Sequence, residues 1–525
     1  MLEVLWNRDW SLDGLTPPWG TLPSIYEEIC KNQELDPLPD DALFSAKGRI
    51  RFSKGASDGA WGHHGNPSKE EDRVQQVVRA LKCLLRAATD SNLRSLYDLV
   101  VQGGILGIAD GVVDQVLAQI PTEHSRLARI ARHFSTRAGH REAVKFGIVL
   151  LGAAGAPEDT AVLMKLGGHD EFSLFAAVAL SRLDENAEQR LWELAQRVRG
   201  WGRIQIVERL AHTCDPEIQK WLLREGFRNS VTNEYLACVC ARAGKLHDAL
   251  NSPLVDGPLL DAAADILHAL INGGPAEGID DYEHAPEAAE AYVKHLWAKR
   301  AVEFKHFLTV DALLRYLGNS EKQEARRKRG WSEERETNVN LLGQDIVSWE
   351  AWSGLAQQGL SANDPRIFHN ADQVAQALGI STRDVHFARV RSDPINSNSW
   401  FELLRQTRDD GIDEVITYAE SVLPLAQIAS VPEEELGLGP GFEPHHALGW
   451  VLQDLRRFPG HGWNLIRTGL RSPVVRNRNM ALKAFAKWAG EQWPPDAITA
   501  LRDARDIEPN SKTKLLIEEI LARKP

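Results

Sequence analysis

An apolar pattern that recurs about every 30 residues limits most strongly how this chain can fold. When the segments beginning at His140 and His169 are aligned, Phe146 matches Phe175, 29 residues later, and the next match is Ile206, 31 residues further on. A helix pair of roughly 30 residues cannot bury its apolar face alone, so neighbouring pairs have to stack into one continuous core. The pattern therefore predicts an all-α fold, an α-solenoid of stacked antiparallel helix pairs.

Between successive members of the pattern lies a second helix with its own start signal. The three signals are Pro157-Glu158-Asp159, Asp184-Glu185-Asn186 and Asp215-Pro216-Glu217. Proline in the first turn sacrifices no hydrogen bond, and acidic residues there favour the positive end of the helix dipole. Alternating strand patterns are almost absent after Glu71, so we expect helices of roughly 10 to 17 residues joined by short turns.

The segment 472–506 carries the most recognisable repeat unit. Pro473 opens its first helix, and the string Arg478-x-x-Ala481-Leu482-x-Ala484-Phe485 resembles the R-x-x-A-A-x-A-L core of HEAT repeats. It departs from that family in one respect, since the proline precedes the arginine by five residues where three is more usual. The resemblance implies a HEAT/armadillo-like α-solenoid. It does not fix a function, because such folds serve many roles.

Composition and pattern divide the chain into five parts. They are an irregular Trp/Pro/Gly-rich segment (1–70), HEAT-like helical repeats (71–275), a less regular helical connector with a charged run (276–345), a further helical region (346–470) and a C-terminal HEAT-like repeat or cap (471–525). Stacked repeats escape the size limit that divides globular cores. We therefore expect one long helical superstructure that bends near residues 320 to 340.

The overall composition excludes several classes of protein. A hydrophobic fraction of 43% and a charged fraction of 26% are average for soluble proteins, which excludes disordered, collagen-like and membrane-embedded chains. The 61 basic and 73 acidic residues give a net charge of -12, which disfavours general affinity for nucleic acids or anionic membranes. Five cysteines are too few for a disulfide framework, and the first residues do not resemble a signal peptide, so we expect a cytoplasmic protein.

A search for catalytic motifs returns no phosphate-binding loop, no H-E-x-x-H and no G-x-S-x-G. The one close cysteine pair is Cys238-x-Cys240, and on a helix the two side chains would point in nearly opposite directions, so they could not readily bind one metal ion. Cys240 also falls on an apolar position of the repeat. We therefore interpret both cysteines as buried packing residues. We expect no catalytic residue, no cofactor and no metal. An enzyme whose site lies in the N-terminal segment or between the two helical halves is the open alternative.

The leading hypothesis is a non-catalytic scaffold or adaptor that binds a protein partner along the groove of the repeat array. We expect the second helix of each pair to line that groove. The candidate contact residues project away from the apolar side of those helices, and they are Lys165, Glu193, Arg197, Lys220 and Arg224.

A second hypothesis is nucleic-acid binding through the segment 371–391, which resembles bacterial helix-turn-helix segments. The small side chain of Ala375 allows the two helices of this segment to pack closely, and Gly379 is expected to make the turn between them. Ser381 is expected to cap the second helix. That helix is expected to present Thr382, Arg383, His386 and Arg389 to phosphates or base edges. The basic run Arg326–Arg329 would add further positive charge for binding the phosphates of the nucleic acid. The acidic net charge makes this hypothesis the weaker of the two.

Overall fold

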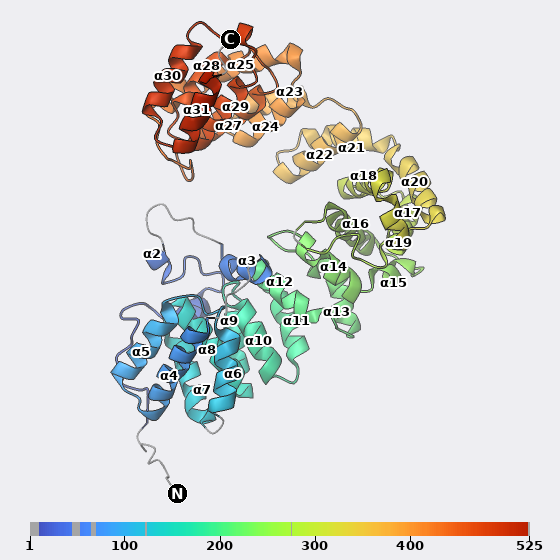
Figure 1. Ribbon diagram of the computed structural model, residues 1–525. Coiled ribbons are helices and arrows are strands. Elements are labelled where there is room, and N and C mark those ends of the chain that lie inside the picture. The colour runs from blue at the N-terminus through green and yellow to red at the C-terminus, as the bar shows by residue number, and fades with distance from the viewer. Residues whose placement is uncertain (1–9, 45–52, 65–69, 121–122, 275, 523–525) are drawn as a thin grey trace. The chain divides into compact units, whose positions relative to one another are not determined.

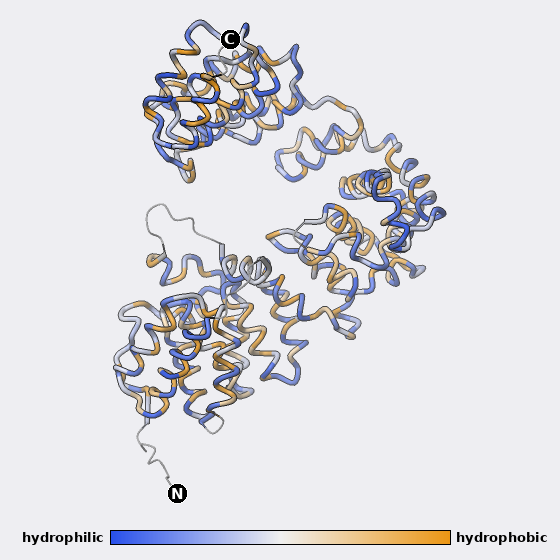
Figure 2. Tube along the Cα trace, in the orientation of Figure 1, coloured by the Kyte–Doolittle hydropathy of each residue, from blue (hydrophilic) through white to orange (hydrophobic). Residues whose placement is uncertain are grey.

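The computed structural model describes residues 10–44, 53–64, 70–120, 123–274 and 276–522 (Figure 1). Across these ranges the regular elements are helices, and the one strand-like pairing is an isolated bridge between Glu435 and Val474. The prediction of an all-α protein is confirmed. Hydrophobic and hydrophilic stretches alternate along the helices (Figure 2), as the apolar pattern requires. The chain forms two compact units, Met1–Trp349 (unit 1) and Glu350–Pro525 (unit 2).

Unit 1 consists of α-helices and short 3₁₀ or π turns, which are labelled η. In chain order they are α1 (Ile25–Lys31), α2 (Asp41–Phe44), α3 (Ala56–His64), α4 (Glu71–Arg86), α5 (Asp90–Val101), α6 (Ala109–Gln119), α7 (His124–Arg137), α8 (Arg141–Ala154), η1 (Pro157–Asp159), α9 (Thr160–Gly167), α10 (Ser173–Leu183), α11 (Ala187–Ala195), α12 (Trp201–Val207), η2 (Glu208–Leu210), α13 (Pro216–Trp221), η3 (Leu222–Gly226), α14 (Glu234–Ala243), α15 (Leu246–Asn251), α16 (Gly257–Asn272), α17 (Ala285–Lys299), α18 (Phe304–Gly318), η4 (Ser320–Lys322), α19 (Gln323–Lys328) and α20 (Glu333–Val347).

Unit 2 contains the remaining helices. They are α21 (Ala351–Leu360), α22 (Pro365–Ala377), α23 (Arg383–Ser392), α24 (Ser397–Gln406), η5 (Asp409–Gly411), α25 (Ile412–Val422), α26 (Leu425–Ile428), α27 (Glu443–Leu455), α28 (Trp463–Leu470), α29 (Val475–Phe485), η6 (Gly490–Gln492), α30 (Ala497–Ile507) and α31 (Ser511–Ala522).

The predicted helix starts are found in unit 1. Pro157 opens η1, which leads into α9, and the side chain of Asp215 caps α13 by accepting hydrogen bonds from the N–H groups of Glu217 (2.8 Å) and Ile218 (3.3 Å). Contacts join α8 to α10, and then α12, α14, α16, α18 and α20 in turn, while α10 also contacts α9 and α11. α8, α10, α12 and α14, which match the aligned segments, therefore contact one another in sequence order, and α16, α18 and α20 extend this row.

The N-terminal segment is less irregular than the sequence predicts, because its described part contains α1, α2 and α3. It lies across the ends of the following helices. Ser24 donates a hydrogen bond to the carbonyl of Thr136 (2.8 Å), and Gln33 donates one to the carbonyl of Lys165 (3.1 Å). Trp10 of this segment is buried.

A buried lysine ties this segment to the helix row. The side chain of Lys145, on α8, is 2% exposed, and its Nζ lies 2.6 Å from a carboxylate oxygen of Asp58, 2.9 Å from Glu142 and 2.8 Å from Glu171. Burial lowers the pKa of Lys145, but the three carboxylates outweigh it and hold the pKa well above its ordinary value. Lys145 is therefore a fixed cation, unsuited to act as a nucleophile.

The same carboxylates also hold backbone groups. Glu142 accepts a hydrogen bond from the N–H of Ile105 (2.7 Å), and Glu171 accepts one from the N–H of Gly55 (2.9 Å). Arg141 adds a second cation, 3.0 Å from Asp40. We call Lys145, Arg141 and their carboxylate partners the Lys145 cluster. It joins three chain segments that lie far apart in the sequence, and each of its buried charges has a partner.

Replacing Lys145 with methionine tests this cluster. The Lys145→Met variant leaves three carboxylates around an uncharged side chain, and we expect the free energy of unfolding to fall by about 3–5 kcal/mol. Guanidinium denaturation followed by tryptophan fluorescence measures the loss. Lys165→Met is the matched control, because Lys165 is half-buried, with no carboxylate bound to it among the described residues. An equal loss in both variants would show that the cluster contributes no special stability.

Two buried histidines beside the Lys145 cluster contribute to the pH dependence of unit 1. Burial lowers the pKa of His140 and of His169 below the usual 6.5, while Lys145 and Arg141, against the effect of burial, lower the pKa of Glu171 below 4.5. Below about pH 6.5 the unfolded chain therefore binds more protons than the folded chain, and stability falls. The raised pKa of Asp58, caused by burial, opposes this trend.

We expect the melting temperature to fall steadily between pH 7.5 and pH 5, and the fall to shrink in a His140→Gln/His169→Gln double variant. Differential scanning fluorimetry across that range measures both. A melting temperature that is constant or rises toward pH 5 would contradict the assignment.

Candidate functional site

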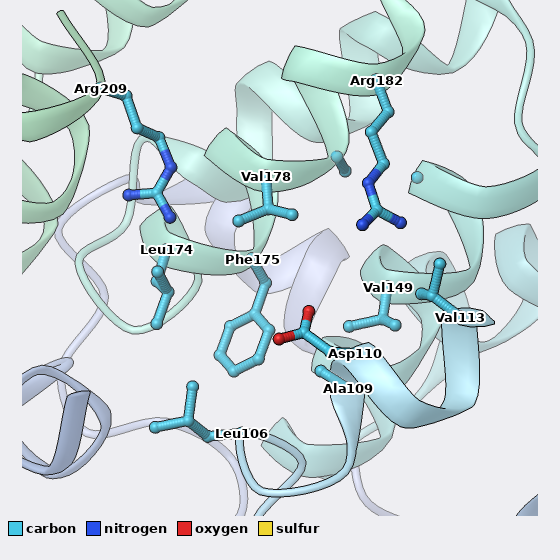
Figure 3. Close-up of a pocket in the computed structure, with 12 residues that line it drawn as sticks. Leu106, Ala109, Asp110, Val113, Val149, Leu174, Phe175, Val178, Arg182 and Arg209 are labelled. Carbon is cyan, nitrogen blue, oxygen red and sulfur yellow. The ribbon is translucent and has the colours of Figure 1, made fainter. Parts of the chain in front are cut away.

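A pocket of about 260 Å³ opens between α6, α8, α10 and η2 in unit 1 (Figure 3). Its walls are apolar, and the residues that form them are Leu106, Ala109, Val113, Val149, Leu174, Phe175, Val178 and Ala179. Val113 and Phe175 are each only 4% exposed, so the floor of the pocket belongs to the core of the helix row. We call this site the α8–α10 pocket.

Three charged side chains complete the lining of the α8–α10 pocket. Asp110, Arg182 and Arg209 are all exposed, and Figure 3 shows the two arginines on opposite sides of Val178. Within the described ranges neither arginine forms an ion pair with a carboxylate, whereas most other arginines of unit 1 do. An apolar floor with two cations at its edge that have no carboxylate partner among the described residues suits an apolar group that carries a negative charge.

The side chain of Arg209 is oriented by a hydrogen bond to the backbone. Its Nη1 donates a hydrogen bond to the carbonyl of Gln205, which fixes one edge of the guanidinium. A carboxylate arriving from a ligand would therefore gain from a cation that is already oriented.

The repeat register explains how the pocket is assembled. The alignment that matches Phe146, Phe175 and Ile206 also matches the positions three residues later, which are Val149, Val178 and Arg209. All three of these line the pocket. The sequence signal of this site is an arginine at a position where the two earlier repeats carry valine.

The predicted partner-binding residues lie elsewhere, on the second helices. Lys165 is on α9, Glu193 on α11, Arg197 just after α11, Lys220 on α13 and Arg224 on η3. Arg197 and Lys220 are exposed, whereas Glu193 accepts a hydrogen bond from Arg190 (3.3 Å) and Arg224 pairs with Asp256 (2.9 Å). None of the five lines the α8–α10 pocket.

The helix-turn-helix-like residues occupy a buried site in unit 2. Gly379 makes the predicted turn with a φ of 74°, but Thr382, not Ser381, is the residue before α23, and its side chain makes no capping bond. Thr382 and His386 are buried, and both hydrogen-bond Asp372 of α22. Their proposed role in contacting a nucleic acid therefore needs correction, because their side chains are used inside the unit.

The other basic candidates are also engaged. Arg383 pairs with Glu414 at 2.8 Å, and the guanidinium of Arg389 lies 3.7 Å from the centre of the Phe368 ring. Arg326 is 1% exposed and binds Glu336 and three backbone carbonyls. Nucleic-acid binding stays a prediction. Fewer basic side chains are available to contact phosphates than the sequence indicates.

Two clusters bear on metal binding. Burial raises the pKa of Cys238 to about 12 and that of Cys240 still higher, which favours the neutral thiols expected of packing residues. Asp372, His386 and Glu402 bring one ligand atom each to within 4.8 Å of one another. No local sequence pattern indicates this second group, because its members lie on three different helices.

Comparisons with family models, with curated proteins and with solved structures find no match to this chain. In the part of the chain that the structure describes, none of the helices combines the length and the apolar character needed to cross a membrane.

Proposed function

We propose that the chain is a HEAT-like helical-repeat adaptor that binds a protein partner through the α8–α10 pocket. The observation that carries this proposal is the combination of a buried apolar floor with Arg182 and Arg209, two cations without carboxylate partners among the described residues. Protein interfaces concentrate their binding energy in a few anchor residues that fill such pockets.

Two features support the HEAT-like solenoid. The first helices of the pairs contact one another in sequence order through unit 1, as stacked repeats require. In unit 2, Arg478, the arginine of the HEAT-like string, is buried, and its guanidinium pairs with Glu508 of the next segment at 2.7 Å. It also donates hydrogen bonds to the carbonyls of Ser472 and Pro473, so it fixes the turn that opens α29.

The size of the pocket favours a protein side chain over a cofactor. Small-molecule sites are usually about 300–1,000 Å³, and the α8–α10 pocket holds about 260 Å³. That volume accommodates one large apolar side chain. The two arginines would then pair with an acidic group next to that side chain, while Asp110 would disfavour a ligand with several negative charges. The partner segment is therefore expected to present one apolar anchor beside one carboxylate.

Charge reversal at the rim tests the proposal. We expect an Arg182→Glu/Arg209→Glu variant to lose at least about tenfold in partner capture, because a charge-assisted hydrogen bond contributes about 1.5–3 kcal/mol. Affinity capture from a native cell extract treated with nuclease, with the partner quantified by mass spectrometry, measures the loss. Circular dichroism confirms that the variant folds, which its exposed arginines should allow.

An Arg197→Glu/Arg224→Glu variant is the matched control, because it reverses two arginines on the second helices. Capture that is lost in this variant and kept in the rim variant would move the interface to the second helices. A partner that disappears on nuclease treatment would replace the protein-binding proposal with a nucleic-acid one.

A further inference from the structure

Three consecutive helices of unit 2 converge on one group of metal-ligating side chains. Asp372 comes from α22, His386 from α23 and Glu402 from α24. The Nε2 atom of His386 lies 2.9 Å from the Oδ1 atom of Asp372, and one ligand atom of each of the three residues lies within 4.8 Å of the others. Asp372 and His386 are buried, while the side chain of Glu402 is 24% exposed.

Neighbouring side chains hold the two carboxylates in place. Asp372 accepts hydrogen bonds from the Oγ1 of Thr382 (2.5 Å) and from the Nε2 of Gln376 (2.7 Å). Arg405 donates to Glu402 from both Nε (3.0 Å) and Nη2 (2.7 Å), and both bonds go to the same oxygen, Oε2. The other oxygen, Oε1, has no protein partner in the described part of the chain, so it is free to serve as a ligand.

Hydrogen bonds of this kind support metal ligands in proteins. Ligating carboxylates are themselves hydrogen-bonded, and such supporting residues orient the ligands and tune the site. An imidazole nitrogen with two carboxylate oxygens is a donor set that Zn²⁺ accepts, because zinc binds both histidine nitrogen and Asp or Glu oxygen. Sulfur ligands are not needed, and the two buried cysteines lie in unit 1.

We propose that Asp372, His386 and Glu402 form a Zn²⁺ site in unit 2, with water in the fourth position. Zinc–nitrogen and zinc–oxygen bonds of about 2.0–2.2 Å place tetrahedral ligands about 3.3 Å apart, so the His386–Asp372 pair opens by a few tenths of an ångström. The side chain of Glu402 rotates so that its Oε1 reaches the metal, and its partial exposure leaves room for this movement. The His386 proton that now faces Asp372 moves to Nδ1, leaving the Nε2 lone pair for the metal.

This site is independent of the proposed adaptor function, since it lies in unit 2 and uses none of the residues of the α8–α10 pocket. A bound ion would fasten the three helices to one another. The consequence is a gain in the stability of unit 2 when zinc is present, because a ligand that binds only the folded state stabilises it by mass action.

Isothermal titration of the full-length, tag-free chain with zinc chloride, after treatment with a chelator, tests the site. We expect one equivalent to bind with a dissociation constant in the micromolar range or below, and a Glu402→Gln variant to bind at least tenfold more weakly. Glu402→Gln keeps the size of the side chain and the partial exposure, so it is expected to fold, whereas removing buried Asp372 or His386 carries a greater risk of unfolding.

The matched control is His369→Gln, which removes an exposed histidine from the same helix as Asp372. We expect it to bind zinc as the wild type does. X-ray absorption at the zinc edge is expected to show nitrogen and oxygen neighbours without sulfur. The proposal is overturned if Glu402→Gln binds zinc as tightly as the wild type, if the sulfur signal dominates, or if no equivalent binds, in which case His386 and Asp372 form only a hydrogen-bonded pair.

Discussion

The ion pairs of Lys145 are the interaction on which the arrangement of unit 1 depends. A lysine that is 2% exposed cannot stay charged inside a protein unless carboxylates surround it, and here they come from Asp58, Glu142 and Glu171. Two of these lie at the starts of α8 and α10, and the third lies in the N-terminal segment. The cluster therefore fixes the spacing of neighbouring repeats and anchors the segment that lies across them.

The same lysine connects the cluster to the α8–α10 pocket. Its ammonium lies 5.6 Å from the centre of the Phe175 ring, and Phe175 forms part of the floor of the pocket. One side of α8 and α10 thus holds the charges and the adjoining side holds the apolar cavity. A pocket whose floor is fixed in this way is pre-organised, so a partner would lose little free energy in ordering it.

Sequence reasoning predicts the helices well and the site poorly, for physical reasons. Helix starts at Pro157 and Asp215 depend on local chemistry, so the sequence alone shows them. Lys145 stands at the repeat position of Leu174, and its burial depends on Asp58, 87 residues away, which local pattern cannot show. The local pattern places His386 on the surface for the same reason, whereas its partner Asp372 lies on another helix. Polar residues are assigned to the surface unless a distant partner is known.

The most direct test of the adaptor proposal is hydrogen–deuterium exchange of the chain alone and with its captured partner. The proposal predicts slower exchange on binding in peptides that cover α6, the end of α8, α10 and η2, with little change on α9, α11 and α13. Protection confined to α9, α11 and α13, or protection in unit 2 alone, would contradict it and place the partner on a different surface.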